Sequence, residues 1–388
     1  MKSTLSTAKL SQKEHLVWFD FVRLLAMLLL VCCHSADPFN FYAGSGQSLT
    51  DHQLLGALWG SAMRPCVPLF VMLTGALLLP VYQDAGPFYR HRISRVLWPF
   101  LIWSFLYNIF PWLLSILGYG NSAIITFFPY AAQTPMTLTY AALQIVKIPL
   151  NFTPVACHMW YIYLIIGLYL YLPIFSAWVQ KASERAKLFF LLTWSITLFL
   201  PYYHYFADQY IWGECTWNAF SMVYYFAGFN GYLLLGHYLK NHPLPLRRVL
   251  FVGIPMFAIG YFITYFGFTT MRAQPQATES MTELFFTYNS INVALMTAPL
   301  FMLSQCTHIK NQNSIRLLRD LTICGFGIYM IHYFFIGPCF LLVNTIHVPV
   351  SIQIPISGLL VFSISWVFVH FLKKLLGKSS RILLGVSK

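Results

Sequence analysis

The stretch 16–36, LVWFDFVRLLAMLLLVCCHSA, decides the fold class of this chain. About 20 consecutive apolar residues are enough for one helix to cross the hydrocarbon core of a bilayer, and this stretch has that length. The rest of the chain has the same character, since 58% of its 388 residues are hydrophobic and only 9% are charged. Soluble domains carry about 25% charged residues, and disordered chains are poor in hydrophobic ones. The sequence therefore predicts an all-α polytopic membrane protein.

Similar apolar windows recur along the chain and predict a bundle of about ten transmembrane helices. The windows are Leu16–Ala36, Leu54–Pro80, Val96–Leu117, Cys157–Trp178, Leu188–Tyr203, Ala219–Leu239, Val249–Phe268, Leu284–Ser304, Leu321–Val343 and Ser351–Leu372. Pro65 and Pro68 interrupt the second window, and broken spans are tolerated only where they pack in protein or line a cavity. A further apolar piece, Leu138–Leu150, is too short to span and predicts an interfacial or re-entrant helix.

The positive charges are distributed unevenly between the two sides of the predicted spans. Of the 24 lysines and arginines, only Lys147, Arg272, Arg23 and Arg64 fall outside one alternating set of loops and the termini. Such an excess is typical of cytoplasmic loops, so both termini are predicted to be cytoplasmic. The net charge of +13 favours an anionic lipid surface over nucleic acid as the partner. We expect one transmembrane domain over residues 1–372 and a basic, lipid-anchoring cytoplasmic tail over 373–388.

The first span carries three residues that are costly at membrane depth, Asp20, Arg23 and His34. Asp20 and Arg23 are spaced i,i+3, so they share a helix face and can pair. Arg23 and His34 point the same way to within about 20° and lie about 16 Å apart along the helix axis. One stripe then carries a cation toward the predicted cytoplasmic side and an imidazole toward the outer side. The alternative is that Arg23 and His34 each snorkel to the nearer membrane surface.

A second histidine, His158, begins the fourth span and is expected at the same outer level as His34. A neutral imidazole can accept a proton from a hydroxyl group near pH 7, which general-base acyl transfer requires. Trp160 and Tyr161 follow closely, and both residue types are also common in the aromatic belt at a membrane interface.

Two further polar residues within spans are candidates for binding. Arg64 could hold a carboxylate or an oxyanion, or it could simply pair with Asp37 or Asp51. His332 lies near the middle of the ninth span, where a lone histidine is more often a hydrogen-bond partner for a neighbouring helix than a catalyst.

Arg92 and Arg95 open the third span on its predicted cytoplasmic side. Their i,i+3 spacing puts them on one face, where they could grip phosphates, although the same run is also an ordinary positive-inside anchor. A Gly-rich phosphate loop, an HExxH helix and a GxSxG elbow do not occur in the sequence. The eight cysteines form no CxxC pair, so neither a disulfide framework nor a metal site is expected.

Five short motifs, taken in order, resemble those of the membrane acyltransferase 3 family, bacterial proteins that O-acylate cell-surface sugars. In the first span, the resemblance lies in Asp20-x-x-Arg23 and in the ten-residue gap between Arg23 and His34. The other motifs are Pro68–Gly75 (with Thr74 where Ser is common), Arg92-x-x-Arg95, His158-x-Trp160-Tyr161 and Gly327–His332. Each motif is weak alone, but five in order along nearly the whole chain are fairly specific.

The resemblance implies a ten-helix O-acyltransferase of the bacterial inner membrane. Such an enzyme would move an acyl group, usually acetyl, from cytoplasmic acyl-CoA to a hydroxyl of a lipid-linked or cell-surface glycan, without a metal. His34 would be the general base or a transient acyl carrier, Arg23 would position the site and the donor, and Asp20 would orient Arg23. The remaining expected roles are catalysis for His158, acyl-CoA binding for Arg92 and Arg95, and substrate binding for Arg64, Trp160, Tyr161 and His332.

The main alternative is a transporter or flippase for a glycan or its precursor, without acyl-transfer chemistry. Intramembrane His and Arg residues could equally line a transport path. Many transporters show an inverted repeat or a matching pair of broken spans, and this sequence has neither. A purely structural scaffold does not explain the charges within the spans. The sequence therefore favours the enzyme.

Overall fold

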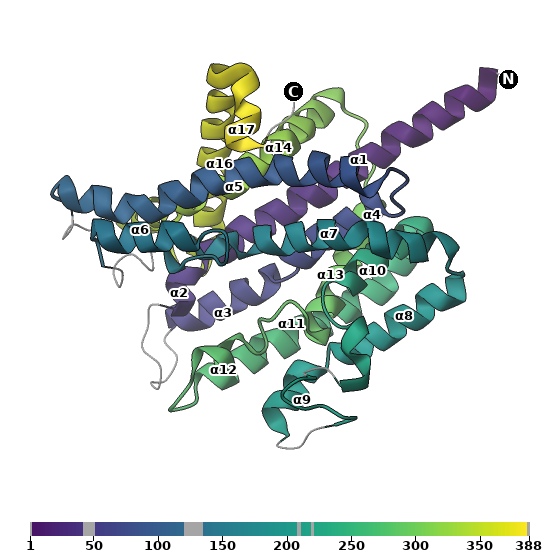
Figure 1. The fold of residues 1–388 in the computed structure, drawn as a ribbon, viewed down its shortest axis with the longest axis horizontal. Coiled ribbons are helices and arrows are strands. Elements are labelled where there is room, and N and C mark those ends of the chain that lie inside the picture. Colours follow the sequence, from purple (N-terminus) through teal and green to yellow (C-terminus); the bar gives the residue numbers. More distant parts are fainter. Residues whose placement is uncertain (1, 42–50, 120–134, 208–210, 219–220, 386–388) are drawn as a thin grey trace. The chain divides into compact units, whose positions relative to one another are not determined.

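The computed structural model describes residues 2–41, 51–119, 135–207, 211–218 and 221–385, and over these residues the chain is all-helical (Figure 1). The chain divides into two compact units. Unit 1 comprises Met1–Leu29, Gly44–Tyr82 and Leu172–Arg319, and unit 2 comprises Leu30–Ala43, Gln83–Tyr171 and Asp320–Lys388. Three helices contribute residues to both units: α1 (Lys2–Ser35), α7 (Trp160–Lys181) and α14 (Gln312–Ile331).

Unit 1 is built mainly from the middle of the chain. Its further helices are α3 (Asp51–Met63), α4 (Cys66–Leu78), α8 (Glu184–Thr197), α9 (Leu200–Phe206), η4 (Ser221–Phe226), α10 (Asn230–Asn241), α11 (Leu246–Arg272), α12 (Glu279–Glu283) and α13 (Ile291–Gln305). Within this unit α4 packs along α10, and α11 packs along α13. The α4–α10 contact is close because a Cβ on Gly75 would lie 1.9 Å from the carbonyl oxygen of Leu233. Small residues allow helix backbones in membranes to approach in this way.

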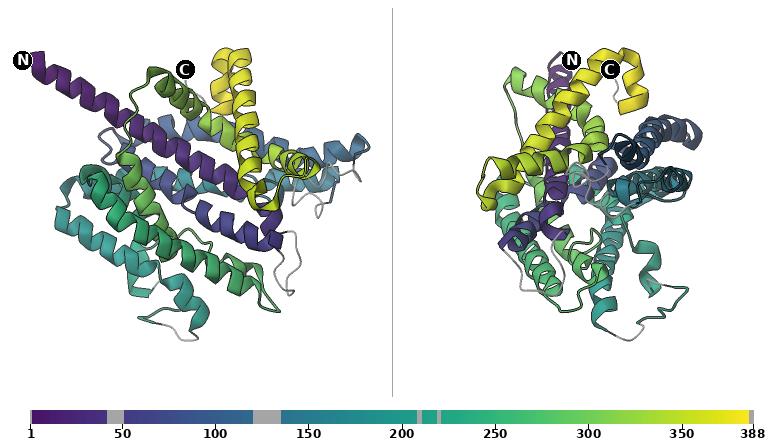
Figure 2. Two further views of the ribbon diagram at one scale, coloured as in Figure 1. Left: turned by 180° about the vertical axis from the view of Figure 1, so that it is seen from behind. Right: turned by 90° about the vertical axis from the view of Figure 1, so that its left-hand side faces the viewer.

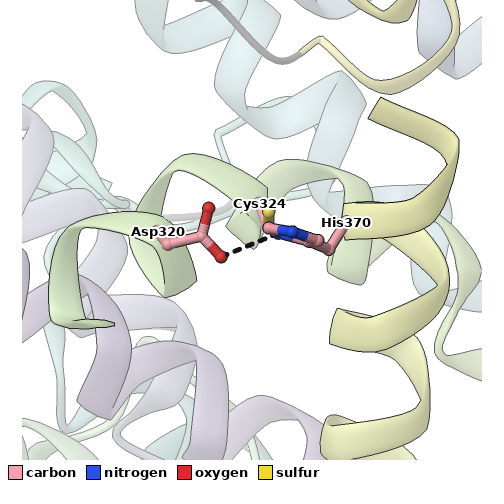
Figure 3. Close-up of side chains that lie close together, drawn as sticks. All are labelled: Asp320, Cys324 and His370. Carbon is pink, nitrogen blue, oxygen red and sulfur yellow. Dashed lines mark hydrogen bonds and ion pairs between the residues drawn. The ribbon is translucent and has the colours of Figure 1, made fainter. Parts of the chain in front are cut away.

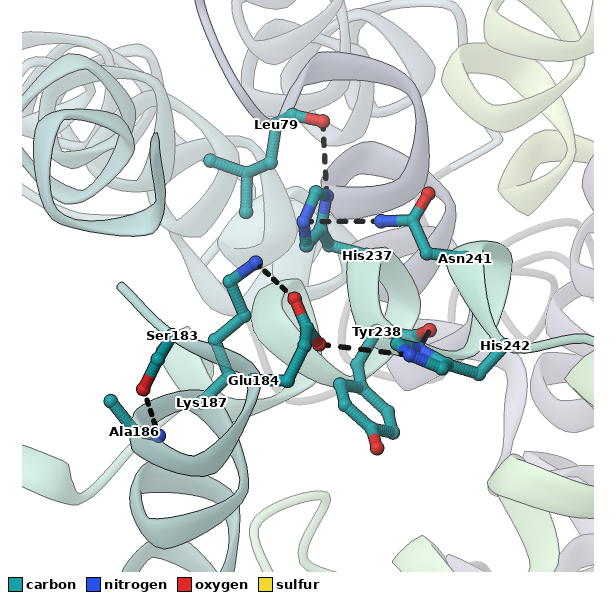
Figure 4. A network of polar contacts seen from close by, with 9 residues as sticks. All are labelled: Leu79, Ser183, Glu184, Ala186, Lys187, His237, Tyr238, Asn241 and His242. Atoms are coloured by element: carbon teal, nitrogen blue, oxygen red, sulfur yellow. Dashed lines mark hydrogen bonds and ion pairs between the residues drawn. The ribbon is translucent and has the colours of Figure 1, made fainter. Parts of the chain in front are cut away.

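A polar network ties three helices of unit 1 together (Figure 4). On α8, Lys187 pairs with Glu184 at 2.8 Å, and the second oxygen of Glu184 lies 3.7 Å from His242, just beyond α10. On α10, Nδ1 of His237 donates to the carbonyl of Leu79 at 3.1 Å, at the end of α4. These contacts fix one end of α10 to its neighbours on both sides.

Unit 2 is built mainly from residues 83–171 and from the last part of the chain. Its further elements are α2 (Asp37–Phe41), α5 (Ala85–Ile116), α6 (Leu138–Lys147), η3 (Pro154–Met159), α15 (Tyr333–Thr345), α16 (Val350–Leu376), η5 (Gly377–Ser379) and α17 (Ser380–Leu384). The C-terminal residues of the last span turn back after α16, where Gly377 has a φ of +53° (Figure 2). The short α17 then packs on α5.

The predicted ninth span is broken at His332. Helices α14 and α15 meet there at an angle of 85°. The hydroxyl of Tyr107 on α5 donates to the carbonyl of Met330 at 2.9 Å, so a side chain enters the hydrogen-bond ladder next to the break. Insertion of this kind is a recognised cause of sharp helix bends. The bend brings His332 to the junction of two helices, where a continuous span was expected.

Among the described residues, seven helices are long and apolar enough to cross a membrane, or eight if the α14–α15 pair is one span. The sixth predicted window contains only the 12-residue α10 after η4, and the eighth contains the 15-residue α13. In its described part the protein is therefore all-helical, with seven to eight candidate spans. The count of ten and the cytoplasmic placement of the termini stay predictions.

Two segments outside the main spans are ordered helices. The predicted short helix is present as α6, which buries Ala141 and Gln144 while Leu143 and Val146 are exposed. Its amphipathic pattern agrees with an interfacial helix, and its position in a membrane stays a prediction. The residues of the expected basic tail begin within α16, which runs to Leu376, and include α17, which packs against α5. The role of this tail as a lipid anchor stays a prediction.

Candidate active site

Three histidines from distant parts of the chain meet in unit 2. His34 lies in the last turn of α1, His158 lies in η3, and His332 lies at the α14–α15 bend. The ring centroids of His34 and His332 are 5.4 Å apart, as are those of His158 and His332. The rings of His34 and His158 are 6.4 Å apart. The structure thus brings together the two histidines that were expected at one level, and it adds His332 to them.

The imidazole of His34 is held by a carboxylate. Its Nδ1 lies 2.8 Å from Oδ2 of Asp37, and both side chains are mostly buried. A carboxylate only accepts hydrogen bonds, so Nδ1 carries the hydrogen, and in the neutral imidazole Nε2 is then the nitrogen that can accept a proton. Sequence reasoning treated Asp37 as a possible partner for Arg64 and missed this role. The i,i+3 spacing of Asp37 from His34 could have predicted this contact.

The other two histidines are fully buried, and part of their hydrogen-bonding capacity is unused. His158 is 1% exposed, and neither of its ring nitrogens has a hydrogen-bond partner among the described residues. In His332, Nδ1 bonds the Tyr329 carbonyl at 2.8 Å within its own helix, whereas Nε2 has no partner among them. A buried polar atom without a partner costs about 1–3 kcal/mol, so a further hydrogen bond to any of these three ring nitrogens would be favourable.

Tyrosine rings enclose His158. The ring of Tyr333 stacks on His158 at 4.6 Å, and that of Tyr107 meets it edge-on at 4.9 Å. The hydroxyl of Tyr329 donates to the His158 backbone carbonyl, and that of Tyr333 lies 3.3 Å from Sγ of Cys157. Sequence reasoning missed all three tyrosines. Tyr329 and Tyr333 could have been predicted as site residues because they lie close to His332 in the sequence. Tyr107 could not be predicted in this way.

Arg23 and Asp20 pair as expected. Nη1 of Arg23 lies 3.1 Å from Oδ1 of Asp20, across one turn of α1. The two side chains are 35% and 22% exposed, so the pair is half-buried. These residues belong to the part of α1 that lies in unit 1, whereas His34 belongs to the part in unit 2.

Arg92 and Arg95 lie near the start of α5 in unit 2. Nε of Arg95 donates to the backbone carbonyl of Gly385 at 3.0 Å. Nε of Arg92 is buried and has no hydrogen-bond partner within the described part of the chain. A backbone carbonyl therefore holds the guanidinium of Arg95, whereas the Nε–H group of Arg92 can still donate a hydrogen bond.

The remaining predicted residues lie in two places. Arg64, in the turn between α3 and α4 of unit 1, is 6% exposed and stacks 3.8 Å above the ring of Phe286. Such a cation–π contact holds the guanidinium in place. Trp160 and Tyr161 begin α7 in unit 2, and the ring of Tyr161 lies 6.0 Å from that of Tyr329, which brings Tyr161 to the tyrosines around His158.

A separate polar cluster in unit 2 contains residue types that can bind metal. Ligand atoms of Asp320, Cys324 and His370 lie within 4.8 Å of one another (Figure 3). The Asp320 carboxylate already accepts from Trp366 at 2.9 Å and from His370 at 3.0 Å, and the ammonium of Lys373 lies 3.5 Å away. A positive charge at that distance opposes a second cation. We therefore interpret the cluster as a clamp between α14 and α16.

Comparison with known protein families gives one match. Residues 16–370 match the model of acyltransferase 3, described as an acyltransferase domain. The chain belongs to the acyltransferase 3 family. The resemblance seen in the sequence motifs is thereby confirmed, and this acyltransferase 3 protein is a multi-pass membrane transferase. Searches of curated proteins and of solved structures give no match.

Proposed function

We propose that this acyltransferase takes an acyl group, acetyl in the first instance, from acyl-CoA and transfers it to a hydroxyl group of a cell-surface or lipid-linked glycan. The observation that carries the proposal is the His34–Asp37 pair, which lies beside two buried histidines with unused ring nitrogens. A base of this kind is what transfer to a hydroxyl group requires. Membership of an acyltransferase family supports the reaction class.

The proposed chemistry uses His34 as the general base. Its Nε2 takes the proton of the acceptor hydroxyl as the hydroxyl oxygen attacks the thioester carbonyl carbon. The tetrahedral intermediate collapses by cleavage of the C–S bond, and the CoA thiolate takes the proton from Nε2. Asp37 stabilises the imidazolium between these steps, and an N–H of His158 stabilises the oxyanion. Transient acylation of His34 would use the same Nε2 atom.

Acyl-CoA would be held near the N-terminal end of α5, away from the histidines. Arg92 and Arg95 would contact its phosphates, because guanidinium groups bind phosphate bidentately. Tyr107, which contacts His158, lies on the same helix about 22 Å further along its axis from Arg92. That length exceeds half of the ~30 Å hydrocarbon core, so the extended pantetheine arm would carry the thioester toward the histidines.

The other residues would position the donor and the acceptor. Arg23, oriented by Asp20, would position the donor and the helix that carries His34. Trp160 and Tyr161 would stack on the sugar ring of the acceptor. For Arg64, substrate binding stays the expected role. We further propose that the protein lies in a bacterial inner membrane with about ten spans and both termini in the cytoplasm, as its positive charges indicate.

Acetyl transfer in membranes that carry His34→Ala tests this proposal. We expect the transfer of radiolabelled acetyl from acetyl-CoA to fall at least ~100-fold, because general-base catalysis typically contributes 10²–10⁴-fold. His308→Ala, which alters an exposed histidine, is the matched control and should retain activity. Undiminished transfer by a well-expressed His34→Ala protein would rule out His34 as the base. Failure of the unmodified protein to release or transfer acetyl would instead favour a glycan transporter.

A further inference from the structure

The C-terminal segment 377–385, which comprises η5, α17 and Gly385, is hydrogen-bonded to α5 through two of its backbone carbonyls. Nε of Arg95 donates to the Gly385 carbonyl at 3.0 Å, and Nε1 of Trp103 donates to the Leu383 carbonyl at 2.8 Å. The two donors are about 12 Å apart along α5, so the contact covers about two helical turns. Because the acceptors are backbone atoms, the contact depends on where the segment lies rather than on its side chains.

Packing fixes the position of this segment. Leu384 is 0% exposed, whereas Ile382 on the same short helix is 55% exposed. Gly385 ends α17 with a φ of +62°, in the left-handed region that glycine adopts readily. A Cβ on Gly385 would lie 2.5 Å from the ring of Phe326 and 3.2 Å from the Arg95 carbonyl. The carbonyl that receives the Arg95 hydrogen bond is therefore closely confined.

The helix that leads into the segment is also anchored. Trp366, His370 and Lys373 near the end of α16 all contact the carboxylate of Asp320 on α14. Figure 3 shows the contact between Asp320 and His370. The turn at Gly377 follows within four residues of Lys373. The segment therefore starts from a clamped helix end and finishes against α5.

We propose that segment 377–385 is a positioning element of the acyl-donor site and acts through Arg95. The bond to a neutral carbonyl holds the guanidinium without cancelling its charge. Arg92, three residues away on the same face, repels Arg95, and an anion that binds both relieves this repulsion. The inference rests on the proposed function, because it takes Arg92 and Arg95 as the groups that bind the phosphates of acyl-CoA.

Coenzyme A binding to the purified protein in detergent provides the test, through the dissociation constant from calorimetry. Leu384→Asp places a charge in a fully buried position and should displace the segment. We expect its dissociation constant for coenzyme A, and its KM for acetyl-CoA in membranes, to rise roughly tenfold while kcat changes little. Ile382→Asp makes the same change on the exposed face of α17 and should leave both constants unchanged.

A double-mutant cycle with Arg95→Ala separates the inference from the proposed function. If the segment acts through Arg95, Leu384→Asp should weaken binding no further in the Arg95→Ala background. Unchanged binding in Arg95→Ala alone would overturn the donor-site assignment itself. If Arg95→Ala weakens binding, two results would overturn only the role of the segment: no effect of Leu384→Asp in the otherwise wild-type protein, or a fully additive effect of Leu384→Asp in the Arg95→Ala background.

Gly385→Ala provides a milder second variant if Leu384→Asp does not yield folded protein. Its Cβ meets Phe326, and alanine is strained at a φ of +62°, so the segment should shift without a new charge. We expect a rise of several-fold in the dissociation constant. Wild-type affinity in folded Gly385→Ala protein, with a thermal midpoint lowered by the same substitution, would show a purely structural role and overturn the proposal.

Discussion

Asp37 determines which nitrogen of His34 can act as a base. The 2.8 Å contact places the hydrogen on Nδ1, so that Nε2 is the proton acceptor in the proposed mechanism. Asp37 begins the short helix α2 after the turn at Ala36, and this turn brings its carboxylate back to His34. The tautomer of His34, the proposed base, therefore depends on the backbone turn at Ala36.

Asp37→Asn should lower kcat for acetyl transfer roughly 10³-fold and change KM for acetyl-CoA little. The reason is that the new amide can donate to Nδ1 and stabilise the wrong tautomer. Initial rates in membranes at several acetyl-CoA concentrations measure both constants. Asp51→Asn, which alters an exposed carboxylate in the first turn of α3, is the control. A kcat within about twofold of wild type would remove Asp37 from the mechanism.

At the scale of elements, glycines set the contact between α4 and α10 in unit 1. A Cβ on Gly236 would lie 2.0 Å from the Met72 carbonyl oxygen, and one on Gly75 would lie 1.9 Å from that of Leu233. The two backbones therefore touch at reciprocal positions. Gly75 is the last residue of the motif Pro68–Gly75, so this part of the family resemblance has a packing explanation.

Gly236→Ala should lower the thermal unfolding midpoint of the purified protein by several degrees. The added methyl group forces the two backbones apart, and overpacking of this kind costs about 1–3 kcal/mol. Gly167→Ala on α7 is the matched control, because a Cβ there meets nothing within 4 Å. Equal midpoints for the two variants would contradict the close contact of α4 and α10.

At the scale of the whole molecule, the distribution of positive charge predicts the orientation in the membrane. Nearly all lysines and arginines lie in one alternating set of loops and the termini. The proposed mechanism depends on this orientation, because Arg92 and Arg95 must meet acyl-CoA inside the cell. In the tertiary structure one long helix, α5, carries both arginines and Tyr107. The same helix therefore carries the proposed donor-binding residues and a residue that contacts His158.

Alkaline phosphatase fusions test this orientation, because the enzyme is active only outside the cytoplasm. A fusion after residue 388 should be inactive, and a truncated fusion after Leu150 should be active, since Leu150 follows three predicted spans. Green fluorescent protein fused at residue 388 should fluoresce. An active phosphatase at residue 388 would reverse the predicted orientation and with it the proposed donor side.

Several features of the molecule could be predicted from neighbouring residues alone. Seven of the predicted windows are long apolar helices, and the Asp20–Arg23 pair forms as its spacing indicates. The motifs identified the family correctly. Apolar length, helical spacing and motif order are properties of the linear sequence, so they can be read without knowing how distant segments pack.

The assembly of the candidate site depended on contacts between distant segments. His332 reaches His34 and His158 because its helix is broken, and the nearby bond joins Tyr107 to Met330 across most of the chain. The contact of Arg95 with Gly385 spans a still larger separation of 290 residues. Sequence alone determined that this protein is a helical membrane acyltransferase. Tertiary structure alone decided which side chains meet, because a bend or a close approach is set by packing partners that no local pattern encodes.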